Sequence, residues 1–459
     1  MKTKTQNMNL TSALAYSVGF GSTNIIWYMI NNYLMLFYTD VVGLTAGAIS
    51  LIMLIARVWD AVNDPMMGVI VDRTHTKWGK FRPYIAIAPP VLAIFNILTF
   101  TVFPVKGTAK VVLCLLTYIG AGMAYTAVSV AINGILNRLS DDSQAKMTIV
   151  TMSQMASTIV GIILSACAMP LILFFSKSDV ANRTGYFITT VIFSIVSVPL
   201  LWFCAWKCKE EVPEAAVTTV SASPAKRSIM ESFKILFKNK NILVAVFMTF
   251  AGATAAMARM SMLSYYIIYV AGSYTLIAPV FTTMTVMQLF GNPVVPILTK
   301  RFGKRNALYI LNIIQIASFL IMYMFPSSNP LFLLGISAII GFSNPVGNIS
   351  YGIMCDAIDY GEYKYGVREE ALASSFMSFG VKLATALTGS LGVLLLDAAG
   401  YVAGAQQTPE AIHGINMIVN LFPAIITIIS MIPMLWYKLD NKTMETVQNA
   451  LRERRAKNQ

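Results

Sequence analysis

Twelve long apolar stretches constrain this chain more than any other feature of its sequence. A helix needs about 20 apolar residues to cross a bilayer, and each stretch reaches or exceeds roughly that length. The chain is 56% hydrophobic and only 12% charged, whereas soluble domains are about 25% charged. The sequence therefore predicts an all-α, multi-pass membrane protein with twelve transmembrane helices. The predicted spans are 12–37, 44–70, 84–104, 111–136, 148–175, 185–206, 242–271, 276–298, 307–325, 331–354, 372–396 and 414–437.

Basic residues are distributed unevenly between the segments that join these spans. With both termini inside, the external loops hold only Lys106, Lys110, Lys177 and Arg183 out of 34 Lys and Arg residues. Cytoplasmic loops normally carry the excess of Lys and Arg, so both termini are predicted to be cytoplasmic, in a bacterial inner membrane. The net charge of +13 then matches anionic lipid headgroups and does not indicate a nucleic-acid partner. Nothing in the sequence requires an oligomer.

A polar segment divides the spans into two sets of six. Residues 207–240 contain charges and an Ala/Val/Thr/Ser/Pro-rich stretch, which is typical of a linker. We therefore expect an N-terminal six-helix bundle over 1–206, a cytoplasmic linker over 207–240, a C-terminal six-helix bundle over 241–437 and a cytoplasmic tail over 438–459.

The two halves repeat one short motif at equivalent places. Trp78-Gly79-Lys80 follows the second span, and Phe302-Gly303-Lys304 follows the eighth. Two convergent basic loops would also explain the similarity. Their equivalent position in a plan of six plus six spans favours an internal duplication, which is how major-facilitator transporters are built.

The second span carries a cluster of polar residues at membrane depth. Arg57, Asp60 and Asp64 lie on one helical face, with Asn63 beside them. Two carboxylates one turn apart repel, and a small cation or a proton relieves that repulsion. Alternatively, Arg57 and Asp60 form an ion pair that joins helices and leaves Asp64 protonated and inert. Acids inside a membrane usually have a function, which favours a cation site.

Catalytic and metal-binding patterns are not found in the sequence. The five cysteines are scattered, both histidines fall in loops, and no HExxH motif or nucleophile–base pair is present. We therefore expect a protein that is not an enzyme, with no cofactor and no metal beyond possible Na⁺ at Asp60 and Asp64. A sensor is disfavoured because the tail is too short for an effector domain.

Several longer motifs identify a family. RVWDAVNDPMMG (57–68) and DRTHTKWGKFRPY (72–84) lie in the first half, and AIDYGEYKYGVREE (357–370) and FMSFGVKLATALTG (376–389) lie in the second. Together they resemble the glycoside–pentoside–hexuronide:cation symporters, the major-facilitator branch that contains melibiose permease. The resemblance spans essentially the whole chain, and it implies cation-coupled sugar transport.

The resemblance also implies site residues. Asp60, Asn63 and Asp64 would form the cation site, and Thr126 in the fourth span would supply a further oxygen. Oxygen ligands suit a monovalent ion, and a buried Asp beside a like charge can take a proton instead, so Na⁺ and H⁺ both remain open. Lys382 would approach this centre from the other half, unless its side chain snorkels.

The chain departs from melibiose permease in the sugar pocket. Asn24 and Ser129 stand where that relative has aspartates, and Gln154 stands where it has an arginine. Loss of these charges argues against an α-galactoside substrate and makes H⁺ more plausible.

Other sugar-binding candidates follow from chemistry, because sugars stack on aromatic rings and bond to amides. Arg259, in the seventh span, either pairs with an acid on another helix or clamps a substrate carboxylate or sulfonate. The remaining candidates are Trp27, Tyr28, Asn31, Asn32, Tyr125, Asn133, Tyr265 and Tyr266.

Charged residues also gather at the cytoplasmic ends of helices. Arg138, Asp356, Asp359 and Arg368 are candidate gating residues that would pair where the two bundles meet. Single exposed ion pairs contribute little, so solvated loops are the alternative.

Taken together, these patterns predict Na⁺- or H⁺-coupled symport of a glycoside, pentoside or hexuronide into the cell. The alternative is an uncoupled facilitator or an exporter of a sugar acid or sugar derivative.

Overall fold

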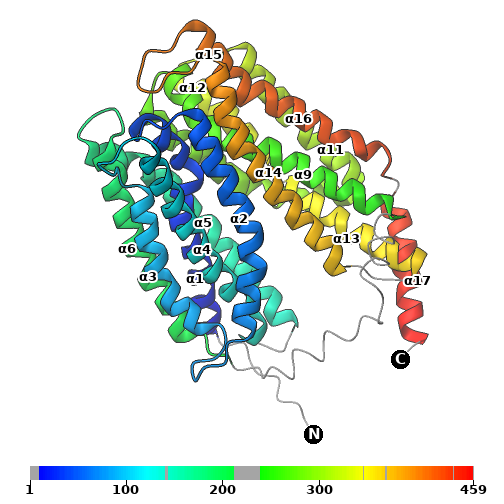
Figure 1. Ribbon diagram of the computed structural model, residues 1–459. Coiled ribbons are helices and arrows are strands. Elements are labelled where there is room, and N and C mark those ends of the chain that lie inside the picture. The colour runs from blue at the N-terminus through cyan, green and yellow to red at the C-terminus, as the bar shows by residue number, and fades with distance from the viewer. Residues whose placement is uncertain are drawn as a thin grey trace. The chain divides into compact units, whose positions relative to one another are not determined.

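The computed structural model describes residues 10–139, 143–210, 238–344, 346–366, 370–437 and 439–457. Within these residues the secondary structure is helical, apart from one isolated β-bridge between Thr76 and Gly79 (Figure 1). The predicted all-α class is therefore confirmed for the described chain. Most of the predicted linker, residues 211–237, lies outside it.

The chain forms two compact units. Unit 1 comprises Met1–Ser223 together with Tyr274–Thr282, and unit 2 comprises Pro224–Ser273 together with Thr283–Gln459. The predicted domain boundaries remain predictions.

Within the described residues, unit 1 contains six long helices together with the segment Tyr274–Thr282. Within it, α1 packs against α5 and α6, α3 packs against α4 and α6, and α2 packs against α4 (Figure 1). Asn182 caps α6 by accepting hydrogen bonds from the backbone of Thr184 and Gly185, as polar N-cap residues do. The helices are α1 (Leu10–Leu36), α2 (Ala46–Asp72), α3 (Arg82–Thr99), α4 (Thr108–Leu139), α5 (Ser143–Ser176) and α6 (Arg183–Lys207), and a π-helical turn, Phe37–Val41, continues α1.

In unit 2, α9 packs against α13, α14 and α16, and the terminal helix α17 packs against α13. A core of aliphatic side chains, among them Ala245, Leu308 and Ile353, fills the space between these helices. The helices are α9 (Lys240–Tyr265), α11 (Val294–Met324), α12 (Pro330–Ser343), α13 (Val346–Tyr365), α14 (Glu370–Ala398), α15 (Pro409–Asn416), α16 (Phe422–Met431) and α17 (Asn441–Lys457). Helix α10 (Ile277–Gly291) contributes residues to both units.

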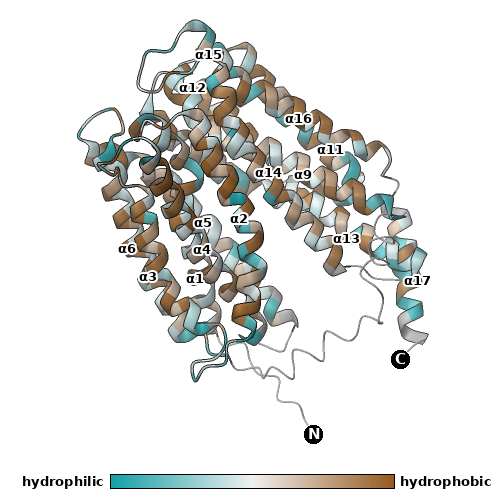
Figure 2. Ribbon diagram, viewed as in Figure 1, coloured by the Kyte–Doolittle hydropathy of each residue, from teal (hydrophilic) through white to brown (hydrophobic). Residues whose placement is uncertain are grey.

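Ten helices of the described chain are long and apolar enough to cross a membrane. Figure 2 shows hydrophobic residues along most of the length of these helices, whereas α17 is largely hydrophilic. Helix α1, with 27 residues, is long enough, but its Ser, Thr and Asn residues make it more polar. The tenth predicted span corresponds to α12 and the start of α13. The protein is a multi-pass membrane protein, and the count of twelve spans remains a prediction.

The eighth predicted span, 276–298, is divided in the structure. Helix α10 ends at Gly291, and α11 begins at Val294, after Pro293. Proline has no backbone N–H and clashes with the preceding turn, so a new helix begins there. The apolar stretch continues across this break, which is why hydropathy does not reveal it.

The repeated Gly-Lys motif has a glycine with positive φ in both halves. Gly79 has φ +104° and Gly303 has φ +79°, values that glycine adopts without steric cost. The following lysines each pair with an aspartate: Nζ of Lys80 lies 2.8 Å from Asp72, and Nζ of Lys304 lies 2.7 Å from Asp356. The positive φ of both glycines agrees with the internal duplication, whereas the aspartate partners differ in position: Asp72 precedes its lysine at the end of α2, and Asp356 follows its lysine on α13.

Candidate functional site

The acidic cluster of α2 faces α4 inside unit 1. Arg57 makes an ion pair with Asp60 at 3.0 Å and donates a second hydrogen bond to the hydroxyl of Tyr118 on α4, at 2.9 Å. The predicted Arg57–Asp60 pair is therefore present. It compensates one charge of the cluster and orients the Asp60 side chain.

The second carboxylate also meets α4. The hydroxyl of Thr126 donates a hydrogen bond to Asp64 at 2.9 Å. A Cβ built on Gly122, one turn earlier on α4, would lie 3.1 Å from Oδ1 of Asp60. Glycine at this position thus lets the carboxylate approach the helix closely. The structure brings together the two carboxylates and the threonine that the resemblance implied.

Asn63 completes the cluster. Its side chain is only 1% exposed, and its amide nitrogen has no hydrogen-bond partner within the described residues. Buried polar groups are almost always satisfied, so an unpartnered one beside two carboxylates is typical of a functional site. Two carboxylates, an amide and a hydroxyl suit a monovalent cation. No group of three His, Cys, Asp or Glu residues that could hold a metal ion occurs in the described chain.

The predicted sugar ligands of α1 and α4 are partly engaged with each other. Trp27 and Tyr125 stack with ring centroids 4.2 Å apart and planes at 18°. Asn133 donates a hydrogen bond to the backbone oxygen of Ser129 at 2.9 Å. Both rings are partly buried.

Of three further candidates, one connects α1 with α5, one is exposed and one has a buried hydroxyl. Asn24 donates a hydrogen bond to Ser157 at 2.7 Å, and Gln154 is exposed on α5. The hydroxyl of Tyr28 is buried and has no partner within the described residues. The assignment of all these residues to a sugar site remains a prediction.

Arg259 is enclosed by unit 2. It is 2% exposed, and it donates hydrogen bonds to the backbone oxygen of Val419 at 3.1 Å and to the side-chain oxygen of Asn420 at 2.5 Å. Its guanidinium lies 4.8 Å from the centroid of the Phe319 ring. Arg259 thereby joins α9 to α11 and to the π-helical turn Met417–Leu421. Within the described chain it has no carboxylate partner, and its role as a substrate clamp remains a prediction.

Lys382 is exposed on α14 in unit 2. Its predicted approach to the acids of α2 remains a prediction, because those acids belong to the other unit.

The candidate gating residues lie in different surroundings. Asp356 is 6% exposed and accepts hydrogen bonds from Lys304 at 2.7 Å and from the Tyr437 hydroxyl at 3.2 Å. Asp356 lies beyond the predicted tenth span. Burial raises the pKa of the Asp356 carboxyl, and Lys304 opposes that shift. Arg138 is buried near the end of α4, Asp359 is partly buried, and Arg368 lies outside the described residues.

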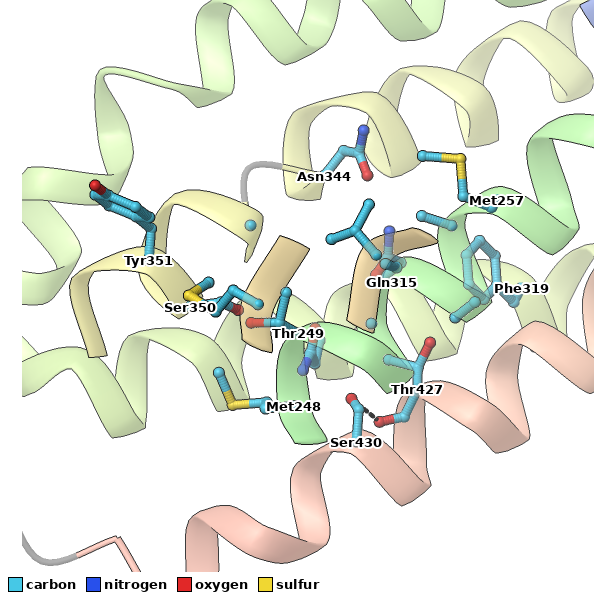
Figure 3. A pocket seen from close by; sticks show the side chains of 18 residues that line it. Met248, Thr249, Met257, Gln315, Phe319, Asn344, Ser350, Tyr351, Thr427 and Ser430 are labelled. Atoms are coloured by element: carbon cyan, nitrogen blue, oxygen red, sulfur yellow. Dashed lines mark hydrogen bonds between the residues drawn. The ribbon is translucent and has the colours of Figure 1, made fainter. Parts of the chain in front are cut away.

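Unit 2 also contains a cavity that the sequence did not reveal. Its volume is about 360 Å³, and α9, α11, α13, α14 and α16 contribute to its wall. Asn312, Gln315 and Asn344 line it, and none of the described lining residues is charged. Figure 3 labels Gln315 and Asn344. The three-residue spacing of Asn312 and Gln315, which places two amides on one face of an apolar helix, is the signal that could have revealed it.

The fold is that of a major-facilitator transporter. The crystal structure of a bacterial homologue of the human lysosomal transporter Spinster, inward-facing and unoccupied, is similar with a TM-score of 0.66 at 12% identity. The match covers 97% of this chain and 99% of that one. At this identity, the similarity concerns the fold alone.

Sequence comparisons identify the family. A family model described as MFS/sugar transport protein matches residues 15–441. The isoprimeverose transporter of Lactiplantibacillus pentosus is 30% identical over 428 residues, which are 93% of this chain and 88% of that protein. The glucuronide carrier protein homolog of Escherichia coli (strain K12) is 27% identical over 449 residues, 96% of this chain and 95% of that protein. The chain belongs to the glycoside–pentoside–hexuronide:cation symporter family, and it is a transporter rather than an enzyme.

Proposed function

We propose that this protein couples the inward movement of a glycoside to that of Na⁺ or H⁺. Asp60 and Asp64 carry this proposal, because both carboxylates meet α4 from one face of a helix apolar enough to span the membrane. A facilitator would have no need for such costly charges. Twelve spans and cytoplasmic termini belong to the same proposal, supported by the distribution of Lys and Arg.

The mechanism follows from charge balance. Arg57 compensates Asp60, so the three charged residues of α2 in this cluster sum to one negative charge when both acids are ionised. A cation or proton at Asp64 neutralises that charge, and Thr126 and Asn63 provide neutral oxygens beside it. Alternating access encloses the cluster in a low-dielectric environment. The desolvation free energy of that step is smaller when the loaded cluster is neutral than when it is charged. One charge moving down 100 mV provides about 2.3 kcal/mol, enough for roughly fifty-fold accumulation.

Uptake into proteoliposomes tests the coupling. We expect an inward Na⁺ or H⁺ gradient, or an inside-negative potential, to drive a radiolabelled glycoside above its external concentration. Collapse of the gradient with an ionophore should release the accumulated sugar. Uptake that stops at equilibrium under every imposed gradient would identify an uncoupled facilitator instead.

The neutral residues of unit 1 predict which substrate is not transported. Because Asn24, Ser129 and Gln154 carry no charge, charge-assisted hydrogen bonds to a galactoside are lost, each worth about 1.5–3 kcal/mol. We expect melibiose to bind at least tenfold more weakly than the preferred glycoside. Competition between melibiose and that glycoside in the uptake assay measures the difference, and equal affinities would contradict the prediction.

Arg259 predicts how substrate charge affects transport. The contacts of its guanidinium are to backbone, Asn420 and Phe319, so we expect Arg259→Gln to weaken uptake of neutral and uronic glycosides by the same factor. Matched methyl glucoside and methyl glucuronide, tested as competitors, measure this. Selective loss of the uronic glycoside would instead support the predicted clamp for a sugar acid.

A further inference from the structure

Three amide side chains line the cavity of unit 2 without a hydrogen-bond partner among the described residues. Asn312 is 2% exposed, yet its side chain makes no hydrogen bond within the described residues. The same holds for the side chains of Gln315 and Asn344, which also line the cavity. Asn312 is buried, whereas Gln315 and Asn344 are half-buried. Three amides that line one cavity without a protein partner leave donors and acceptors that a bound ligand can satisfy.

The chemistry of the wall specifies that ligand. An amide both donates and accepts hydrogen bonds, as a sugar hydroxyl does. No described lining residue is charged, so an anion or a cation would lose its hydration without compensation. A purely apolar ligand would leave the amides unpaired. Ligand pockets usually measure about 300–1,000 Å³, and the 360 Å³ cavity lies in the lower part of that range.

Aromatic side chains stand at two ends of the cavity. Figure 3 places Tyr351 at one end and Phe319 at the other, with Thr249 and Gln315 between them. Tyr351 is 62% exposed, whereas Phe319 is buried and lies against the Arg259 guanidinium. Apolar faces of sugars stack on such rings. Arg259 is not among the described lining residues. Its guanidinium packs on the Phe319 ring and so can hold that ring in place without contacting the cavity.

We propose that this cavity binds one neutral sugar ring of the transported glycoside, with Asn312, Gln315 and Asn344 as hydrogen-bonding ligands. The proposal rests on the proposed transport function and specifies its substrate as a glycoside whose bound ring is uncharged. It adds a site in unit 2 to the predicted candidates of unit 1.

Equilibrium binding to the purified full-length protein tests the proposal. The probes are methyl β-glucoside, methyl β-xyloside and methyl β-glucuronide, and the readout is ligand-dependent thermal stabilisation. We expect Asn312→Ala and Gln315→Leu each to raise the Kd of the preferred neutral probe about 3- to 10-fold. Asn306→Ala removes an exposed amide from the same helix, away from the cavity, and should leave Kd unchanged.

The Gln315→Leu variant and a comparison of binding with uptake separate loss of the cavity site from misfolding and from loss of coupling. If the buried Asn312 variant fails to fold, the Gln315→Leu variant at a half-buried position still reports on the cavity. Unchanged Kd in Gln315→Leu, no stabilisation of the wild type by either neutral probe, or stronger stabilisation by the glucuronide would overturn the proposal. Binding that depends on Gln315 without gradient-driven uptake would support the cavity and refute the coupling. Gradient-driven uptake that is unchanged in Gln315→Leu would support the coupling and refute the cavity proposal.

Discussion

Replacing Asp60 or Asp64 by asparagine is expected to abolish concentrative uptake while leaving sugar binding and exchange partly intact. An amide keeps the shape of the carboxylate but cannot balance the charge of an arriving cation. At an inside-negative potential of about 100 mV, accumulation should therefore fall from roughly fifty-fold to the external concentration.

Asp179→Asn provides the matched control, because Asp179 is an exposed acid in the loop after α5. Uphill uptake and sugar-for-sugar exchange in the same vesicles separate loss of coupling from loss of protein. Accumulation at the wild-type level by either α2 variant would show that the acids of α2 do not carry the coupling ion.

Lys304→Met is expected to destabilise the protein by about 3–5 kcal/mol, the typical effect of removing one partner from a buried ion pair. The Asp356 side chain is 9% exposed and that of Lys304 is 29% exposed, so the buried carboxylate would keep, among the described residues, only the hydrogen bond from the Tyr437 hydroxyl. Additional replacement of Asp356 by leucine should restore much of the stability, because no charge then remains buried. Acidification should also reduce the loss, since a protonated Asp356 is neutral.

The repeated motif supplies the control for this second prediction. Lys80 pairs with Asp72, and the Lys80 side chain is 12% exposed whereas that of Asp72 is 72% exposed. The carboxylate left by Lys80→Met is therefore hydrated, and the loss should be close to the roughly 0–1 kcal/mol of exposed pairs. Thermal unfolding of both lysine variants, measured in the same detergent, gives the comparison. Equal losses for Lys80→Met and Lys304→Met would contradict the difference in burial between the two halves.

Local spacing was sufficient to predict the part of the site that lies on one helix. Asp60 and Asp64 are four residues apart, so both carboxylates face the same neighbour in any regular helix. Their meeting with Thr126 required the family resemblance, because nothing in hydropathy specifies which helix packs against α2. The repeated Gly-Lys motif was likewise detectable, since a tight turn with positive φ favours glycine.

Contacts between distant segments could not be predicted in this way. Arg259 bonds to Asn420, 161 residues further along the chain, and an amide is not an obvious partner for a buried guanidinium. The cavity amides Asn312 and Asn344 come from separate helical regions, and each lies near another uncharged polar residue of its own segment, Gln315 and Ser343. Such residues are common in packed helices, and only the tertiary structure shows that they line one cavity.

The sugar affinity with and without the coupling cation tests the central claim most directly. Linkage requires that a cation which drives sugar accumulation also tightens sugar binding, by about 5- to 150-fold for typical coupling energies. Titration of purified protein with the preferred glycoside, at saturating and at zero Na⁺ and at high and low pH, measures this factor. We predict such a shift for one of the two cations in the wild type, and its loss in Asp64→Asn. Identical sugar affinities under all conditions, or a shift that persists in Asp64→Asn, would contradict a cation site at the acids of α2.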